Sequence, residues 1–266
     1  MWIGAATLAY RTILLALAIF LFSTPTLSQE IRGTASGNQT VELPQASPGA
    51  LVYKPAMRSA RAGGGRVAAA VRGEEGEAPS ILALAPDHVG VTSRKQPTLY
   101  WYISKPTSGR LVFTLNDARR SQALIEADLA SPREGGIQAI KLSDLNADLA
   151  PGVVYQWFVK LKADSGQPSK EARYGGSIMY EDPSPDLKKR LADAGAAGAP
   201  TLYAGEGLWY DAFAATWNAS KADEEKSNRQ QRISLLKQIG FGAPSRAKMT
   251  IETELEILRL IEQTGQ

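Results

Sequence analysis

The sequence predicts an α+β protein in which an N-terminal β-sandwich is followed by a small C-terminal helical bundle that packs on it. Two patterns predict this fold class. Residues 79–180 consist of short segments with alternating or β-branched side chains, separated by turn residues, which is typical of β-sandwiches. In residues 181–266 the apolar side chains instead recur at the spacing of helices. The chain before residue 79 divides by composition into residues 1–28 and 29–78.

Residues 1–28 have the features of a signal peptide. A single basic residue, Arg11, precedes an unbroken apolar run at residues 13–22. This run is too short to span a bilayer, which takes about 20 residues, and it has the length of a signal-peptide core. Small residues follow, so we expect cleavage after Ser28 and a new N-terminus at Gln29. The alternative is an uncleaved N-terminal anchor; in both cases the rest of the chain is expected in the periplasm or outside the cell.

Residues 29–78 are predicted to form a disordered linker. The stretch is rich in Gly, Pro, Ala, Ser and Arg, and it shows no sustained strand or helix period. An alternative role for its basic, Gly-rich part at 58–72 is contact with anionic lipid or cell-wall polymer. Three glutamates that follow this part offset some of its charge, so we favour the linker interpretation.

Seven strands are predicted within residues 79–180. In the fourth, Ile125, Ala127 and Leu129 share one face while Glu126 and Asp128 face water. A period of two of this kind indicates a sheet with one buried face. The predicted strands are 81–84, 97–104, 109–116, 122–129, 136–142, 153–162 and 172–180.

A short motif at the start of the sixth predicted strand supports the sandwich. Leu149, Pro151, Gly152 and Tyr155 have the spacing L-x-P-G-x-x-Y, and Trp157 follows. This resembles the start of a late strand in fibronectin III and immunoglobulin-like sandwiches, in which the tyrosine hydroxyl bonds to backbone upstream. The spacing therefore predicts a tyrosine corner at Tyr155 in a sandwich of that type.

Residues 181–266 are predicted to be helical. Ser184 is suited to cap a helix whose first residue is Pro185. Residues 201–218 are expected to hold the end of this helix, a turn with glycine and the start of the next helix. Apolar spacing predicts two more helices. They cover residues 224–239 and 248–263.

The order of these features resembles the bacterial domain-of-unknown-function family 928, which is of cyanobacterial type. The similarity covers residues 81 to about 241, and its most specific part contains Trp209, Tyr210 and Asp211. The resemblance implies a fold and an extracytoplasmic compartment but no activity. It implies no disulfide either, because the family's two cysteines are absent from this chain.

The segment around Trp209 is also similar to the middle of a tetratricopeptide repeat. Solenoids of such repeats need about three units to bury a continuous core, and only one is present in this sequence. We therefore interpret the segment as a helical hairpin that packs on the sandwich.

The sequence contains no recognisable catalytic constellation. His88 is the only histidine and there is no cysteine, which excludes a histidine metal cluster, a zinc-cysteine site and a thiol nucleophile. We interpret His88 as a surface loop residue. The Gly-rich segments match neither the P-loop nor the dinucleotide fingerprint, and nothing marks a catalytic carboxylate pair. We therefore predict that the protein is not an enzyme and takes no cofactor or metal.

The aromatic residues of the strands are the remaining candidate site. Tyr100, Tyr102 and Trp157 lie on two predicted strands, and a strand with aromatics on both faces offers one face on which a sugar or peptide could stack. The alternative, which we favour, is that the helical region covers this face, with Trp209 and Tyr210 packed onto it.

Charge and composition limit the function classes further. The formal net charge is only +3 and the basic residues are scattered, which argues against nucleic-acid binding. No second apolar stretch of spanning length follows the signal, so no membrane span is expected after cleavage. The leading hypothesis is an exported binding or scaffold protein whose partner is an unknown protein of the cell envelope. The alternative is a carbohydrate-binding module that holds a glycan on the strand aromatics.

Overall fold

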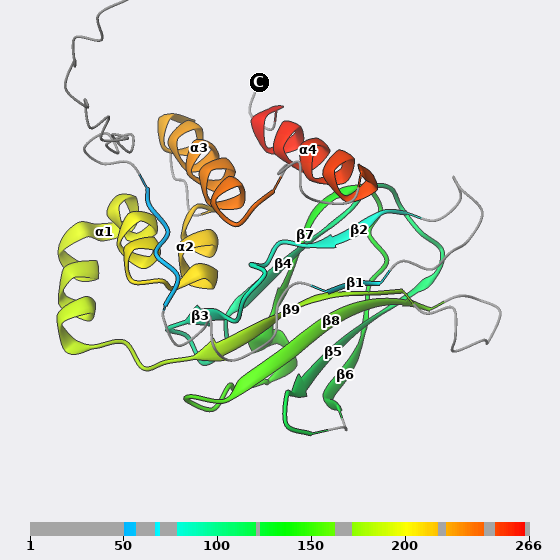
Figure 1. The fold of residues 1–266 in the computed structure, drawn as a ribbon, viewed down its shortest axis with the longest axis horizontal. Coiled ribbons are helices and arrows are strands. Elements are labelled where there is room, and N and C mark those ends of the chain that lie inside the picture. The colour runs from blue at the N-terminus through cyan, green and yellow to red at the C-terminus, as the bar shows by residue number, and fades with distance from the viewer. Residues whose placement is uncertain are drawn as a thin grey trace, which may run out of the picture. The chain divides into compact units, whose positions relative to one another are not determined.

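The computed structural model is of mixed α+β type, with strands in the N-terminal part and helices in the C-terminal part (Figure 1). The described residues belong to one compact unit, Gln45–Gln266. They are 51–56, 67–69, 79–120, 123–162, 172–217, 222–241 and 248–263. The predicted signal peptide and most of the predicted linker lie outside them.

The described residues form two sheets, and the larger one has six strands. The order is β1-β9-β8-β5-β6, with antiparallel neighbours, and β3 pairs with β9 in parallel. One half of the outer edge of β9 is paired by β1 and the other half by β3. The strands are β1 (Val67–Ala69), β3 (Gly90–Thr92), β5 (Arg110–Asp117), β6 (Ala123–Leu129), β8 (Val154–Lys162) and β9 (Ala172–Tyr180).

The smaller sheet has three antiparallel strands in the order β2-β4-β7. With these, all seven predicted strands are present, and only their ends differ. The sequence did not predict β1, which lies within the predicted linker, or β3, which follows the predicted loop around His88. The strands of the small sheet are β2 (Ile81–Ala83), β4 (Thr98–Ile103) and β7 (Gly136–Lys141).

The alternating residues of these strands form the core. On β6 the faces are as predicted, with Ile125 and Leu129 half-buried and Glu126 and Asp128 exposed. Trp157 of β8 pairs in register with Leu115 of β5, so both point to the same side of the sheet. A single cluster of buried side chains joins the two sheets. It includes Leu99, Trp101, Ile103, Leu111, Phe113, Leu115, Trp157 and Val159.

The predicted tyrosine hydrogen bond is present at the start of β8. The buried Tyr155 hydroxyl accepts a hydrogen bond from the backbone N–H of Ala150 at 3.1 Å. Gly152 adopts a φ of 71°, a left-handed conformation that glycine adopts without steric cost. Pro151 forms a bridge with Tyr180 at the end of β9. The motif therefore anchors the loop before β8 to the sheet.

The change Tyr155→Phe is expected to lower the free energy of unfolding by about 1–3 kcal/mol, because the Ala150 N–H loses its partner while the ring stays packed. Denaturant unfolding measures the difference. Tyr174→Phe is the matched control: Tyr174 is half-buried and its hydroxyl bonds to no described residue. Equal effects at the two positions would contradict a structural role for the corner.

In the described part of the chain, four helices follow the strands. The Ser184 hydroxyl caps the first by accepting a hydrogen bond from the Leu187 N–H at 3.1 Å, with Pro185 at the first helical position, as predicted. This helix is interrupted at Gly195, whose φ is 61°, a break that the sequence analysis did not anticipate. Helices α1 and α2 contact each other, as do α3 and α4. The helices are α1 (Pro185–Gly205), α2 (Trp209–Ala215), α3 (Ala222–Gln238) and α4 (Lys248–Gln263).

Two described pieces of the predicted linker are part of the fold, which corrects the linker interpretation for those pieces. One is β1. The other, residues 51–56, lies beside the end of α1 and has Leu51 and Tyr53 buried in the core (Figure 1). The Gln238 side chain of α3 accepts from the Tyr53 N–H at 2.8 Å and donates to the Leu51 carbonyl at 3.1 Å. Residues 51–56 are kept in the fold by apolar side chains that contact distant parts of the chain, although the sequence around them has the composition of a linker.

Gly207 in the turn between α1 and α2 allows residues 51–56 to come close. Its φ is 76°, and a Cβ there would lie only 2.6 Å from the Lys54 carbonyl oxygen. The Lys54 N–H in turn donates to the Ala204 carbonyl at 3.0 Å. A side chain at position 207 would therefore force both an unfavourable backbone conformation and a clash.

Candidate functional site

The predicted stacking residues lie where the helices meet the sheets. Tyr102 and Trp157 are fully buried. Tyr100 is half-buried. It forms a T-shaped pair with Phe213 of α2 at a centroid distance of 5.2 Å, and Trp217 stacks on it at 5.5 Å. The helical region thus packs on the Tyr100 face, and of the three residues Tyr100 alone lines a pocket that is described below.

Tyr210 of α2 reaches the buried Trp157. Its hydroxyl accepts a hydrogen bond from the Trp157 Nε1–H at 2.9 Å and donates one to the Ser177 carbonyl at 3.1 Å. Two glycines make room for it: a Cβ on Gly90 would lie 2.6 Å from the Tyr210 ring, and one on Gly176 would lie 3.3 Å from its hydroxyl. Burial raises the pKa of Tyr210 well above its usual range. The side chain is therefore a neutral, fully bonded link between α2 and β8.

The neighbouring Trp209 has no access to solvent. Its ring stacks on Phe213 at 5.8 Å, and the edge of Tyr53 meets it at 5.3 Å. Trp209 therefore joins α2 to residues 51–56.

Asp211 ties α2 to the loop after β3. Its fully buried carboxylate accepts hydrogen bonds from the Ser93 N–H at 2.7 Å and the Ser93 hydroxyl at 3.0 Å. The Thr92 hydroxyl is a further donor, and the Arg94 Nε lies 3.3 Å away. Burial raises the pKa of Asp211, while the hydrogen bonds and the Arg94 charge oppose this rise. Trp209, Tyr210 and Asp211 thus connect α2 to residues 51–56, to β8 and to the loop after β3.

A family model described as Domain of Unknown Function (DUF928) matches residues 62–249. The chain belongs to the DUF928 family. No curated protein and no solved structure matches it. The match to the DUF928 model includes the strands of both sheets and helices α1, α2 and α3.

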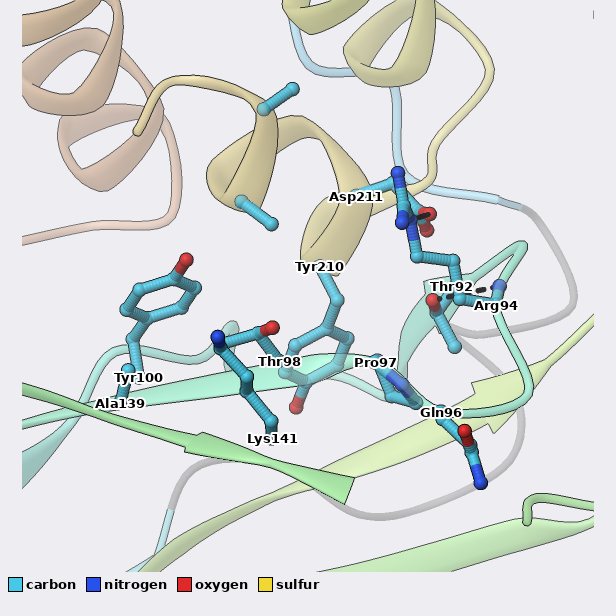
Figure 2. Close-up of a pocket in the computed structure, with 12 residues that line it drawn as sticks. Thr92, Arg94, Gln96, Pro97, Thr98, Tyr100, Ala139, Lys141, Tyr210 and Asp211 are labelled. Atoms are coloured by element: carbon cyan, nitrogen blue, oxygen red, sulfur yellow. Dashed lines mark hydrogen bonds and ion pairs between the residues drawn. The ribbon is translucent and has the colours of Figure 1, made fainter. Parts of the chain in front are cut away.

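A pocket of about 210 Å³ lies between α2, β4, β7 and the loop after β3 in this DUF928 chain (Figure 2). Tyr100 and Thr98 contribute from β4 and Lys141 from β7, while Arg94 comes from the loop. Tyr210 and Asp211 contribute from α2. Sequence reasoning did not single out Arg94 or Lys141, because nothing in the sequence connects two such distant positions.

The outer edge of β6 is a second candidate site of the DUF928 chain. Within the described residues β6 pairs only with β5 and ends the sheet. Leu124 on this strand is 46% exposed. It shares a face with Glu126, which pairs with Lys162 at 3.4 Å, and with Asp128, whose partner Arg110 lies 2.6 Å away. The alternation of this strand was visible in the sequence, but its position at the edge was not.

His88 lies in a different environment from the surface loop that we predicted. It is half-buried, and its Nε2 lies 2.7 Å from the Tyr53 hydroxyl, with the two rings stacked. Burial lowers the pKa of His88, which favours the neutral ring, while Asp87 opposes this. The sequence could not reveal this contact, because Tyr53 stands in the predicted linker. His88 thus helps to hold residues 51–56.

None of the helices within the described residues is both long and apolar enough to cross a membrane. No three His, Asp or Glu side chains among them gather closely enough to hold a metal ion.

Proposed function

We propose that this DUF928 chain is an exported, non-catalytic binding or scaffold protein of the cell envelope, which holds an extended segment of a partner protein at the free edge of β6. The observation that carries the proposal is the contrast between the two edges of the large sheet. The edge at β9 is covered by β1 and β3, whereas no described strand pairs with the outer side of β6. An uncovered edge of this length presents unpaired N–H and C=O groups to a partner strand.

We further propose that the two sheets form a sandwich of the fibronectin III or immunoglobulin type. In the standard strand letters of that fold, β2, β4 and β7 would be strands A, B and E, which gives the small sheet the order A-B-E. In the large sheet, β9, β8, β5 and β6 would be strands G, F, C and C′. The Tyr155 hydrogen bond at the start of strand F supports the same assignment. Domains of this architecture commonly serve adhesion and assembly, and the proposed function rests in part on that analogy.

The charges on β6 favour a partner with basic side chains. In an antiparallel pair of two β6 strands, the Glu126 and Asp128 side chains of both copies would gather on one face, and like charges that face each other across strands are destabilising. Each carboxylate already has one cation of this chain beside it, Lys162 or Arg110. A foreign strand with Lys or Arg at alternate positions would add a second cation to each, whereas a second β6 strand would add further carboxylates. We therefore propose a different protein, and not a second copy of this chain, as the occupant.

The glycan alternative receives less support from the positions of its residues. Tyr102 and Trp157 are fully buried, so neither ring is open to a sugar. Tyr100 has aromatic neighbours from the helical region on its ring. A module that binds a sugar on all three strand aromatics would require the helices to move away.

Export is proposed from the predicted signal peptide at residues 1–28, which lies outside the described residues. The apolar run and the small residues before Gln29 support it. A partner in the periplasm or at the cell surface follows from this location.

A photo-crosslinking residue in place of Leu124 tests the proposal in the native host. We expect an adduct with one envelope protein, because the side chain at this position would lie beside the partner strand. Mass spectrometry identifies the partner, and the same sample is expected to begin at Gln29. The same probe in place of Lys189, which is exposed on α1, should give no such adduct.

A charge-reversed chain with Glu126→Lys and Asp128→Lys is the matched control for this experiment. Both side chains are exposed, and surface ion pairs such as theirs with Lys162 and Arg110 contribute only about 0–1 kcal/mol each. We therefore expect a chain that still folds, with a slightly lower melting temperature, but loss of the adduct at position 124. An adduct of two copies of the chain, or equal adducts from both probe positions, would contradict the proposed partner. Intact residues 1–28 in the membrane fraction would contradict a cleaved signal.

A further inference from the structure

The pocket beside α2 has the size of a site for one small molecule or one unit of a polymer. Its volume of about 210 Å³ corresponds to roughly seven water molecules at about 30 Å³ each. One side is apolar, formed by Pro97, Ala139, Ala214 and the ring of Tyr210. The rest of the wall is mainly polar, with side chains from β4, β7 and the loop after β3, together with Thr92 of β3 and Asp211 of α2 (Figure 2).

Several polar groups of this wall have no partner within the described residues. The Lys141 ammonium, the Tyr100 hydroxyl and the side chains of Gln96 and Thr98 make no hydrogen bond or ion pair with another described residue. Groups of this kind bind water or a ligand. Their convergence from separate parts of the chain on one small pocket is the first argument for a ligand.

The charge of the wall is the second argument. Arg94 and Lys141 are its two cations, and Asp211 is its single carboxylate. Asp211 is fully buried and already bonded to Ser93 and Arg94, so its charge is compensated within the protein. Arg94 uses its Nε for this contact, while a guanidinium has five N–H groups in all. The pocket therefore offers excess positive charge and free donors.

Tyr100 adds a further donor to the wall of the pocket. Burial raises its pKa to about 12, so its hydroxyl keeps its proton at neutral pH. The ring is held in place by Phe213 and Trp217, and a donor with a fixed position loses little freedom when it binds.

We propose that this pocket binds a small anionic ligand, namely the carboxylate or phosphate group of a hydroxylated molecule the size of one sugar unit. Lys141 and Arg94 hold the anionic group, and Tyr100 and Thr98 donate to its oxygens. Gln96 bonds a neighbouring hydroxyl, and the apolar side near Pro97 takes the carbon skeleton. This site is separate from the edge of β6, and it does not depend on the partner protein proposed there.

Calorimetric titration of the purified full-length protein with four probes tests the proposal. The probes are glucuronate, glucose 6-phosphate, inorganic phosphate and glucose. We expect saturable binding of at least one anionic probe and at least tenfold weaker binding of glucose, because glucose lacks the charge that the cations recognise. Preference for glucuronate assigns the ligand to carboxylates, and preference for the two phosphates assigns it to phosphates. Tryptophan fluorescence, compared with that of a Trp217→Phe variant to isolate the contribution of the ring that stacks on Tyr100, gives an independent readout.

Variants separate a built site from general charge attraction. Lys141→Ala and Tyr100→Phe should each weaken binding of the anionic probe about tenfold, the loss expected for one hydrogen bond to a charged group. Lys189→Ala on the exposed surface of α1, and the charge-reversed β6 chain, should bind as the unchanged protein does. The proposal is overturned if no anionic probe binds, if glucose binds equally well, or if Lys189→Ala weakens binding as much as Lys141→Ala.

Discussion

Asp211→Ala is expected to lower the free energy of unfolding by about 2–6 kcal/mol, because it leaves two donors without a partner at roughly 1–3 kcal/mol each. The affected donors are the backbone N–H and the hydroxyl of Ser93, which both bond to this carboxylate. A loss of this size is a large part of the total stability of a domain, which is about 5–15 kcal/mol. Denaturant unfolding measures it. Asp193→Ala on the exposed surface of α1 is the control, with an expected change within about 0.5 kcal/mol.

The pH dependence of stability checks the environment of the same carboxylate. The pKa of Asp211 is raised in the folded chain, mainly by burial. At pH values between the unfolded and the folded pKa, the carboxyl group therefore keeps its proton in the folded chain and has lost it in the unfolded chain. The contribution of this group to stability is then fully present below the unfolded pKa, and it falls as the pH rises through the folded pKa. Asp211→Asn should remove this decline. An unchanged slope of unfolding free energy against pH would show that the carboxylate does not titrate in this way.

The strands could be predicted because their signals are local. Alternation over six to nine residues marks β4, β5, β6 and β8, and the spacing from Pro151 to Tyr155 predicted a hydrogen bond that the structure contains. The Ser184 cap and the helix bounds are also local signals. The pairing of the strands is not local, so the sequence did not show that β6 would end the sheet.

Features that depend on distant partners could not be predicted. Residues 51–56 have the composition of a linker, and their place in the core depends on Gln238 and on the close approach that Gly207 allows. The pocket depends on Lys141 and Arg94, which the pairing of β4 with β7 and the turn after β3 bring together. Of the three aromatic residues that the sequence suggested as candidates, only the structure distinguishes the pocket residue Tyr100 from the buried Tyr102 and Trp157.

We propose a protein partner before a glycan because the helical region covers the aromatic residues of the strands. Trp209, Tyr210 and Phe213 of α2 are almost completely buried, and full burial of a large apolar side chain contributes about 1.5–3 kcal/mol. The three together contribute an amount comparable with the whole stability of a domain. Removing the helices also uncovers Tyr100 and takes away the Tyr210 partner of Trp157.

A chain that ends at Tyr180, compared with the full chain in thermal unfolding, tests this claim most directly. We predict that the shortened chain shows no cooperative transition at the melting temperature of the full protein and that it aggregates, because it exposes the side chains that α2 covers. Tyr210→Phe in the full chain should still fold, with a stability lower by about 1–3 kcal/mol. A shortened chain that folds with an unchanged melting temperature would contradict the account. The aromatic face would then not depend on the helices, and the glycan alternative would rank above the protein partner.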